Sequence, residues 1–164
     1  MSLNKEKLFT SYYNEYKDKL YTYILYRVNF NRANAEDLLS EIFLKAYKNF
    51  ESFNQDKPFK SWIYKIARNH LINFYRDTKI ELELTDMQIE KIITLKDVDV
   101  KIDAEKVMKK IYQLDDYSRD VLIMRYINEF DNQEIAEILG KNENAIRTQI
   151  SRALNKIKDL MENI

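Results

Sequence analysis

The only glycine of the chain, Gly140, lies between two stretches whose apolar residues recur at helical spacing. Gly140 can adopt the left-handed backbone conformation that often ends a helix, and Asn142 is a suitable N-cap for a second helix directly after it. Ala136 is small enough to let two helices approach closely. The pattern predicts a helix-turn-helix, whose second helix can read duplex DNA. The alternative is an ordinary pair of helices with a solvated basic face.

The fold expected for the whole chain is all-α. One glycine and one proline in 164 residues cannot supply the turns of an all-β protein. Asn34 is predicted to cap the second helix, and Pro58 to begin the third. The expected helices span residues 5–29, 34–50 and 58–78, followed by four short helices from about residue 103 that end in a recognition helix over residues 143–161.

Charge is unevenly distributed along the chain, although the formal net charge is zero. Basic residues outnumber acidic ones over residues 57–79 and again over 140–158, whereas residues 81–103 are mainly acidic. Two separate surfaces for nucleic-acid backbone are therefore expected, with ordinary charge scatter as the alternative. We expect one small domain over residues 1–79, an acidic linker over 80–103 and a second small domain over 104–164.

The helix expected after Pro58 has two faces of different chemistry. Phe59 and Trp62 are interpreted as core residues on one face. The other face combines cations, amides and an aromatic ring, which suits single-stranded nucleic acid because bases stack on rings and phosphates meet cations. Its residues are Lys60, Tyr64, Lys65, Arg68, Asn69, Asn73 and Arg76.

Several functional classes lack the residues that they need. The absence of cysteine excludes disulfides and thiolate metal sites, and a lone histidine, His70, favours a structural or solvated role. Neither a glycine-rich phosphate loop nor a metal-ligand spacing occurs, so no catalytic residue, cofactor or metal is expected. No apolar run approaches the length of a membrane span, and Met1–Lys7 lacks a signal-peptide core. We therefore expect a cytoplasmic protein without membrane insertion.

Four segments resemble the bacterial extracytoplasmic-function (ECF) sigma factors of RNA polymerase. They are Ala35–Tyr47 and Lys57–Arg76, similar to the second conserved region of that family, and Leu114–Tyr126 and Asn132–Leu154, similar to its fourth region. Their order and spacing make the combination specific and cover nearly the whole chain. The resemblance implies an all-α protein with a region 2 helical bundle and a region 4 helix-turn-helix domain joined by the linker.

The resemblance also implies a function. Such a protein is an alternative sigma factor that binds core RNA polymerase and directs it to promoter DNA. The first domain would recognise the downstream (−10) element as a melted strand, and the second would read the upstream (−35) element as duplex. Sigma factors of this class are usually inhibited by a cognate anti-sigma factor, so a partner of that kind is expected.

Roles of individual residues follow from the resemblance by position. Docking on the large polymerase subunit would use Asp37, Leu38, Glu41, Phe43 and Ala46. Capture of a flipped base would use Asn54, Gln55, Asp56 and Lys57, and the melted strand would also contact Lys60, Lys65, Arg68, Asn69, Asn73 and Arg76. The upstream duplex would contact Glu143, Asn144, Arg147, Thr148, Ser151, Arg152 and Lys156.

The chain departs from the family pattern at Gln149 and at Asp115–Asp116, and two functions other than that of a sigma factor stay open. Gln149 stands where the family often has arginine, which leaves the upstream sequence preference open, and Asp115–Asp116 replaces a proline-containing turn. The chain could instead be a stand-alone helix-turn-helix regulator, which would bind a palindrome as a dimer but would leave the Lys57–Arg76 helix unexplained. It could also be a sigma-like protein that docks on polymerase without initiating transcription.

Overall fold

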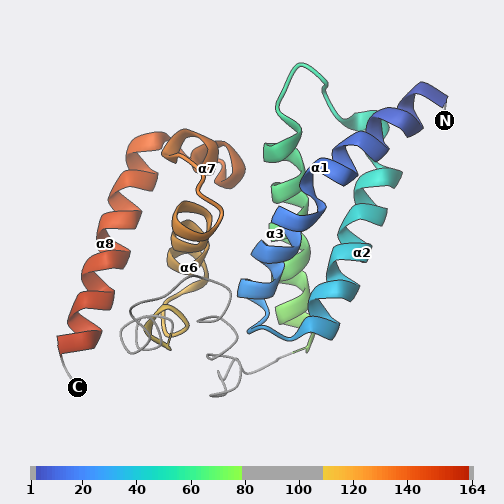
Figure 1. Ribbon diagram of the computed structural model, residues 1–164. Helices are drawn as coiled ribbons and strands as arrows, with labels where there is room; N and C mark the ends of the chain where they lie inside the picture. The colour runs from blue at the N-terminus through green and yellow to red at the C-terminus, as the bar shows by residue number, and fades with distance from the viewer. Residues whose placement is uncertain (1–2, 79–108, 163–164) are drawn as a thin grey trace. The chain divides into compact units, whose positions relative to one another are not determined.

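The computed structural model describes residues 3–78 and 109–162 (Figure 1). All regular elements in these two ranges are helical, which confirms the all-α fold class. The chain divides into two compact units, one built on residues 1–80 and the other on most of the residues from 81 onward. The expected acidic linker, residues 80–103, lies outside the described residues.

The first unit is a bundle of three helices, α1 (Leu3–Arg27), α2 (Arg32–Lys48) and α3 (Phe59–Thr78). Each helix packs against the other two, and a short 3₁₀ turn, η1 (Phe50–Ser52), follows α2. The bundle interior is mainly apolar, because the helices bury their periodic aliphatic residues toward one another, although the side chain of Arg27 is also fully buried. The fully buried aliphatic side chains include Leu20, Ile24, Ile42, Ile63 and Leu71.

The corner between α1 and α2 is tight and uses two left-handed residues that are not glycine. Asn29 has φ 58° and Phe30 has φ 61°. The Phe30 side chain is buried, with its ring centroid 4.7 Å from that of Tyr26. Asn31 then caps α2, because its side-chain oxygen accepts a hydrogen bond from the backbone N–H of Asn34 at 3.0 Å. The prediction that Asn34 is this cap is wrong, since Asn34 lies in the first turn and supplies the donor.

An aromatic cluster joins α1, α3 and the segment between α2 and α3. The Phe59 ring stacks on Tyr12 with centroids 4.1 Å apart, and it meets Phe53 edge-on at 5.5 Å. Trp62 is half-buried with its ring 5.0 Å from that of Phe53. Aromatic pairs in such arrangements contribute about 0.5–1.5 kcal/mol beyond the burial of their surface. The core assignment of Phe59 is confirmed, and Trp62 belongs to the same cluster at its edge.

The second unit contains α6 (Asp116–Leu122), the π-helical turn η2 (Ile123–Ile127), α7 (Asn132–Leu139) and α8 (Glu143–Glu162). α6 packs against α8 and continues directly into η2. Isoleucines dominate the apolar side of this unit, and α8 buries one stripe of its surface against the shorter helices. The buried residues of α8 are Ile146, Ile150, Ala153 and Ile157.

The turn between α7 and α8 has the local chemistry that the sequence predicts. Gly140 has φ +65°, and the backbone N–H of Lys141 donates to the carbonyl of Ala136 at 2.9 Å. Asn142 caps α8, because its side-chain oxygen accepts from the backbone N–H of Ala145 at 2.7 Å. A glycine C-cap followed two residues later by an asparagine N-cap therefore confirms the predicted helix-turn-helix.

Candidate nucleic-acid interfaces

The seven residues predicted to contact upstream duplex all lie on α8, and all are exposed. Six of them fall at positions i, i+1, i+4, i+5, i+8 and i+9 counted from Glu143, and this spacing places them along one side of a helix. The opposite side is buried against the unit. The structure thus brings Glu143, Asn144, Arg147, Thr148, Ser151 and Arg152 onto one exposed stripe, with Lys156 one turn further along.

Arg147 is held by two neighbours in the first turns of α8. Its Nη1 donates to Oδ1 of Asn144 at 2.7 Å, and its Nη2 lies 3.1 Å from Oε1 of Glu143. Exposed pairs of this kind contribute only about 0–1 kcal/mol to stability, so their main effect is to orient the guanidinium. An arginine fixed in this way can present its remaining N–H donors to the acceptors of a guanine edge.

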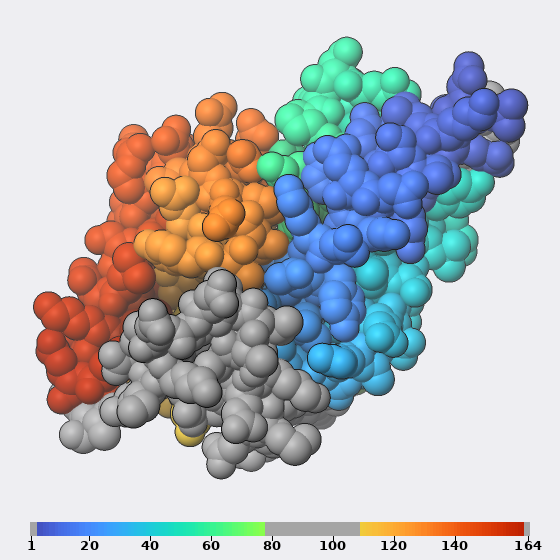
Figure 2. All heavy atoms as spheres, in the orientation of Figure 1, coloured from blue at the N-terminus to red at the C-terminus, as the bar shows by residue number. Residues whose placement is uncertain are grey.

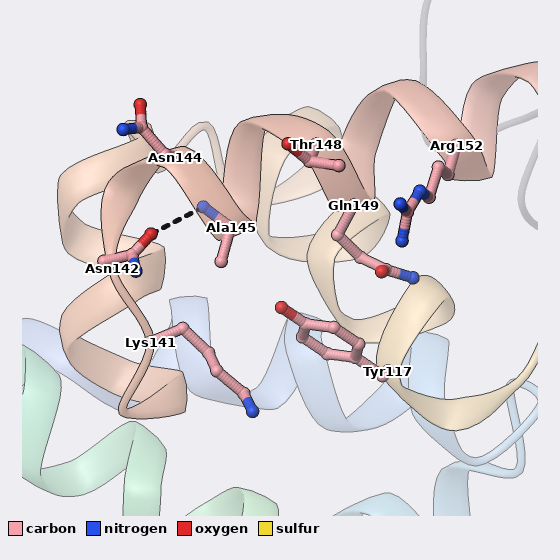
Figure 3. Close-up of a pocket in the computed structure, with 8 residues that line it drawn as sticks. All are labelled: Tyr117, Lys141, Asn142, Asn144, Ala145, Thr148, Gln149 and Arg152. Carbon is pink, nitrogen blue, oxygen red and sulfur yellow. Dashed lines mark hydrogen bonds between the residues drawn. The ribbon is translucent and has the colours of Figure 1, made fainter.

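A pocket of about 420 Å³ lies beside this stripe, between the start of α6 and α8 (Figure 3). Asn144, Thr148 and Arg152 belong to both the stripe and the pocket. Lys141 and Tyr117 are residues that the sequence reasoning missed, and the Lys141 Nζ lies 5.9 Å from the centre of the Tyr117 ring. The position of Lys141 in the turn of a helix-turn-helix is the sequence feature from which it could have been identified. The pocket is lined by Tyr117, Lys141, Asn142, Asn144, Ala145, Thr148, Gln149 and Arg152.

Gln149 points toward α6 and does not lie on the exposed stripe. Its Nε2 donates to Oγ of Ser118 at 2.7 Å, and both groups are partly buried. Ser118 is itself tied to the residue before α6, because its backbone N–H donates to Oδ1 of Asp115 at 2.7 Å. The Gln149 side chain is therefore occupied in joining the recognition helix to α6.

Asp115 is the N-cap of α6, and its pKa is lowered. The main cause is the hydrogen bond from the Ser118 backbone, helped by the Ser118 hydroxyl and the charges of Lys156 and Arg119, while partial burial opposes it. Because the folded state lowers this pKa, the carboxylate stabilises the fold fully above the ordinary carboxyl pKa. That contribution is lost as the pH falls through the folded-state pKa.

Replacing Asp115 with alanine is expected to lower the free energy of unfolding of the second unit by about 0.5–2 kcal/mol near neutral pH, because the cap is lost. The deficit relative to the wild type should shrink in acid, where the wild-type carboxylate becomes protonated. Unfolding followed by circular dichroism at pH 7 and pH 3 measures it, with Trp62 fluorescence reporting the first unit separately. The D115N variant, a neutral cap, is the control. A deficit of the same size at both pH values would contradict the assignment.

The four residues predicted to capture a base form an exposed loop between η1 and α3, the green segment that projects from the end of the bundle in Figures 1 and 2. Within it, the side-chain oxygen of Asn54 accepts from the backbone N–H of Asp56, and its carbonyl accepts from that of Lys57, both at 3.0 Å. Buried rings, Phe53 and Phe59, stand on either side of the loop. Asn54, Gln55, Asp56 and Lys57 are thus presented on a turn that is anchored at both ends.

The predicted melted-strand face of α3 is accessible except at one residue. Lys65, Asn69 and Arg76 are exposed, and Lys60, Arg68 and Asn73 are half-buried. Tyr64 has no exposed surface, and its ring lies 5.5 Å from that of Tyr23. Burial raises the pKa of the Tyr64 hydroxyl far above its usual value. The interpretation of Tyr64 as a stacking residue on this face is therefore wrong.

The predicted docking residues on α2 separate into two groups. Asp37 and Glu41 are exposed, whereas Leu38, Phe43 and Ala46 are buried in the bundle. Leu44, which the prediction omitted, is 55% exposed on the same helix. The Glu41 Oε2 also lies 2.7 Å from Nε2 of His70 on α3, a contact that the 29-residue separation hid from sequence reasoning. Of the five predicted docking residues, only the two carboxylates are therefore accessible, and the exposed Leu44 lies on the same helix.

Neither a metal site nor a membrane span is found in the parts of the chain that the structure describes. No group of three or more histidine, aspartate or glutamate residues among residues 3–78 and 109–162 could hold a metal ion. None of the described helices is long and apolar enough to cross a membrane.

Comparisons with known proteins find families, relatives and a solved structure that this chain resembles. Residues 12–80 match the Sigma-70 region 2 family, and residues 104–157 match Sigma-70, region 4. The ECF RNA polymerase sigma factor SigW of Bacillus subtilis is 29% identical over 91% of this chain and 86% of its own. The RNA polymerase sigma factor SigV of the same organism is 30% identical over 78% and 76%. The sigma factor RpoE, solved with the anti-sigma factor NepR from Bartonella quintana, has a similar fold, with a TM-score of 0.70 at 19% identity over 95% of this chain and 98% of that one.

Proposed function

The chain belongs to the ECF sigma factors of RNA polymerase, and we propose from that premise that it reads promoters through the two surfaces described above. As an alternative sigma factor it binds core RNA polymerase and directs it to start transcription at specific promoters. In the proposal, the exposed stripe on α8 contacts upstream duplex. The loop of residues 54–57 and the exposed face of α3 contact the melted strand.

The observation that carries the duplex assignment is the single stripe on α8. A recognition helix in the major groove needs its reading residues on one exposed side and its packing residues on the other. Arg147 is the candidate for base reading, because Glu143 and Asn144 orient its guanidinium at the start of the helix. Lys156 stands one turn further along and suits a phosphate contact, which positions a protein without reading sequence.

The anchored loop supports the melted-strand assignment. A flipped base must leave its stack, which costs a few kcal/mol. A loop whose ends are already fixed by Phe53 and Phe59 loses little further conformational freedom when it binds, so more of the contact energy remains to offset that cost. The cations on α3, exposed at Lys65 and Arg76, suit the strand backbone next to the captured base.

Polymerase docking is assigned to the accessible part of α2. Asp37, Glu41 and Leu44 would make the contacts, while Leu38, Phe43 and Ala46 would support the helix from the core. A cognate anti-sigma factor is a further expected partner, since the structurally similar RpoE was solved with one. Sigma factors are DNA-binding initiation factors, and no enzymatic activity is proposed for this chain. A cytoplasmic location follows from the proposed work on polymerase and promoter DNA.

Run-off transcription tests the proposed function. Purified protein is added to core polymerase on fragmented DNA from the source organism, and the 5′ ends of the transcripts are mapped. We expect new start sites that require the protein and share two spaced upstream motifs. Reactions without the protein give the background. Folded protein with active polymerase but without new starts would contradict the proposal.

The two alternative functions give different results in parallel assays. A dimeric regulator would protect a palindrome on duplex DNA in the absence of polymerase, with half-sites one helical turn apart. A docking-only protein would co-purify with core polymerase without producing any new start. An asymmetric site that is recognised only together with polymerase is the result that the proposal requires.

A further inference from the structure

We propose that His70 is a positioning residue of the polymerase-docking face, and that it holds the carboxylate of Glu41 ready for a cationic group of core RNA polymerase. The inference rests on the proposed docking role of α2 and adds a residue from a second helix to it. The helices α2 and α3 pack against each other in the first unit (Figure 1), and the contact between Glu41 and His70 bridges them at the surface.

The contact has the geometry of a strong hydrogen bond. Nε2 of His70 lies 2.7 Å from Oε2 of Glu41, and the two side chains are 23% and 58% exposed, respectively. A carboxylate only accepts hydrogen bonds, so Nε2 of the imidazole carries the hydrogen and donates it. Because the ring is the more buried of the two groups, the packing of α3 fixes the ring, and the ring in turn fixes the carboxylate.

The Glu41 carboxylate keeps acceptor positions for a partner. The hydrogen bond from His70 occupies one lone pair of Oε2, whereas a carboxylate can accept about four hydrogen bonds in all. More than half of the Glu41 side chain is exposed, so a lysine or arginine of the polymerase can reach the remaining positions. Asp37, which is exposed one turn earlier on α2, adds a second carboxylate for such a cation.

Without His70, Glu41 would have a competing partner on its own helix. Lys45 is exposed one turn after Glu41, at the i and i+4 spacing at which a glutamate and a lysine attract each other. In the structure the Glu41 carboxylate instead contacts His70 on α3. His70 therefore keeps the carboxylate from being neutralised along α2, and it restricts rotamer freedom that docking would otherwise have to remove.

The test is a double-mutant cycle on the affinity of the full chain for purified core polymerase. The four proteins are wild type, Glu41→Ala, His70→Leu and the double variant. We expect His70→Leu to weaken binding about two- to tenfold, the effect of leaving one long side chain to be ordered on binding. In the Glu41→Ala background the same change should have no further effect, because no carboxylate remains to be positioned.

A rescue variant and a matched control separate positioning from a merely structural role. His70→Gln should restore most of the affinity, because the glutamine amide places an N–H donor near the position of Nε2. A loss that His70→Gln does not restore would assign His70 a packing role instead. Lys5→Gln is the control, since it breaks another contact between elements of the first unit, 3.2 Å from Lys5 Nζ to Glu51 Oε1, and should leave the affinity unchanged.

The results separate the inference from the docking assignment on which it rests. Equal losses from His70→Leu in the wild-type and Glu41→Ala backgrounds, or no loss in either, would overturn the inference. If Glu41→Ala itself weakens binding in that case, the docking role of α2 survives. If Glu41→Ala and Asp37→Ala both bind core polymerase as wild type does, the proposed docking face is wrong, and the role of His70 is overturned with it.

Discussion

Replacing Phe59 with alanine is expected to destabilise the first unit by about 3–5 kcal/mol, the usual cost of emptying a buried phenylalanine site. The Phe59 side chain is only 3% exposed. Its ring stacks on Tyr12 with an interplanar angle of 1° and also contacts Phe53 and Trp62. The surrounding rings come from α1, α3 and the segment before α3, so no single movement can refill the space. Stability of a whole domain is about 5–15 kcal/mol, which makes this loss large.

Urea unfolding followed by the fluorescence of Trp62 measures this loss directly, because the only tryptophan of the chain lies in the affected cluster. Ile72→Ala is the matched control, since Ile72 is an apolar residue of the same helix that is 36% exposed, and it should change stability far less. We also expect weaker binding of the melted strand, because Phe59 anchors one end of the loop at residues 54–57. A loss below about 1 kcal/mol would show that the cluster repacks.

Replacing Arg147 with alanine is expected to relax selectivity at one base pair of the upstream element. An arginine that reads a guanine edge contributes about 1–3 kcal/mol of discrimination, so the preference for that base pair should fall by roughly 5- to 150-fold. The contacts with Asn144 and Glu143 orient the guanidinium before DNA arrives, which suits a base reader. The α8 backbone should be unaffected, because the side chain of Arg147 is exposed.

The measurement is a set of promoter affinities for the holoenzyme, in which each base pair of the upstream element is changed in turn. Arg147→Ala should flatten the response at one position and leave the others unchanged. Lys158→Ala provides the control, because this exposed cation lies on the same side of α8 about three turns beyond Arg147, and its loss should not alter any single-position preference. Unchanged selectivity in Arg147→Ala would remove Arg147 from the reading role.

The helix-turn-helix could be predicted from sequence because its chemistry is local. Gly140 and Asn142 end one helix and start the next through contacts with residues no more than five positions away. The cap of α2 shows the limit of the same logic. Asn31 and Asn34 are equally suitable caps, and the left-handed corner that precedes Asn31 decides between them.

The errors and omissions arise from contacts between distant segments. The chemistry of tyrosine suits either the buried or the exposed side of a helix. The contact with Tyr23 on α1 places Tyr64 on the buried side. By its sequence position alone, Gln149 could read a base. Its hydrogen bond to Ser118, 31 residues away, instead holds the side chain toward α6. The resemblance predicts a docking segment on α2, but only packing shows that Phe43 faces the core and Leu44 faces outward.

The left-handed corner between α1 and α2 restricts how this chain can vary in evolution. A non-glycine residue in the left-handed region costs about 1–2 kcal/mol, and Phe30 accepts that cost while its ring is buried against Tyr26. Glycine at this position would relieve the backbone strain but leave a cavity, whereas a larger side chain would keep the backbone strain and overpack the site. We therefore expect position 30 to tolerate few single substitutions. We expect sequence change at this corner to require simultaneous substitution of both Tyr26 and Phe30.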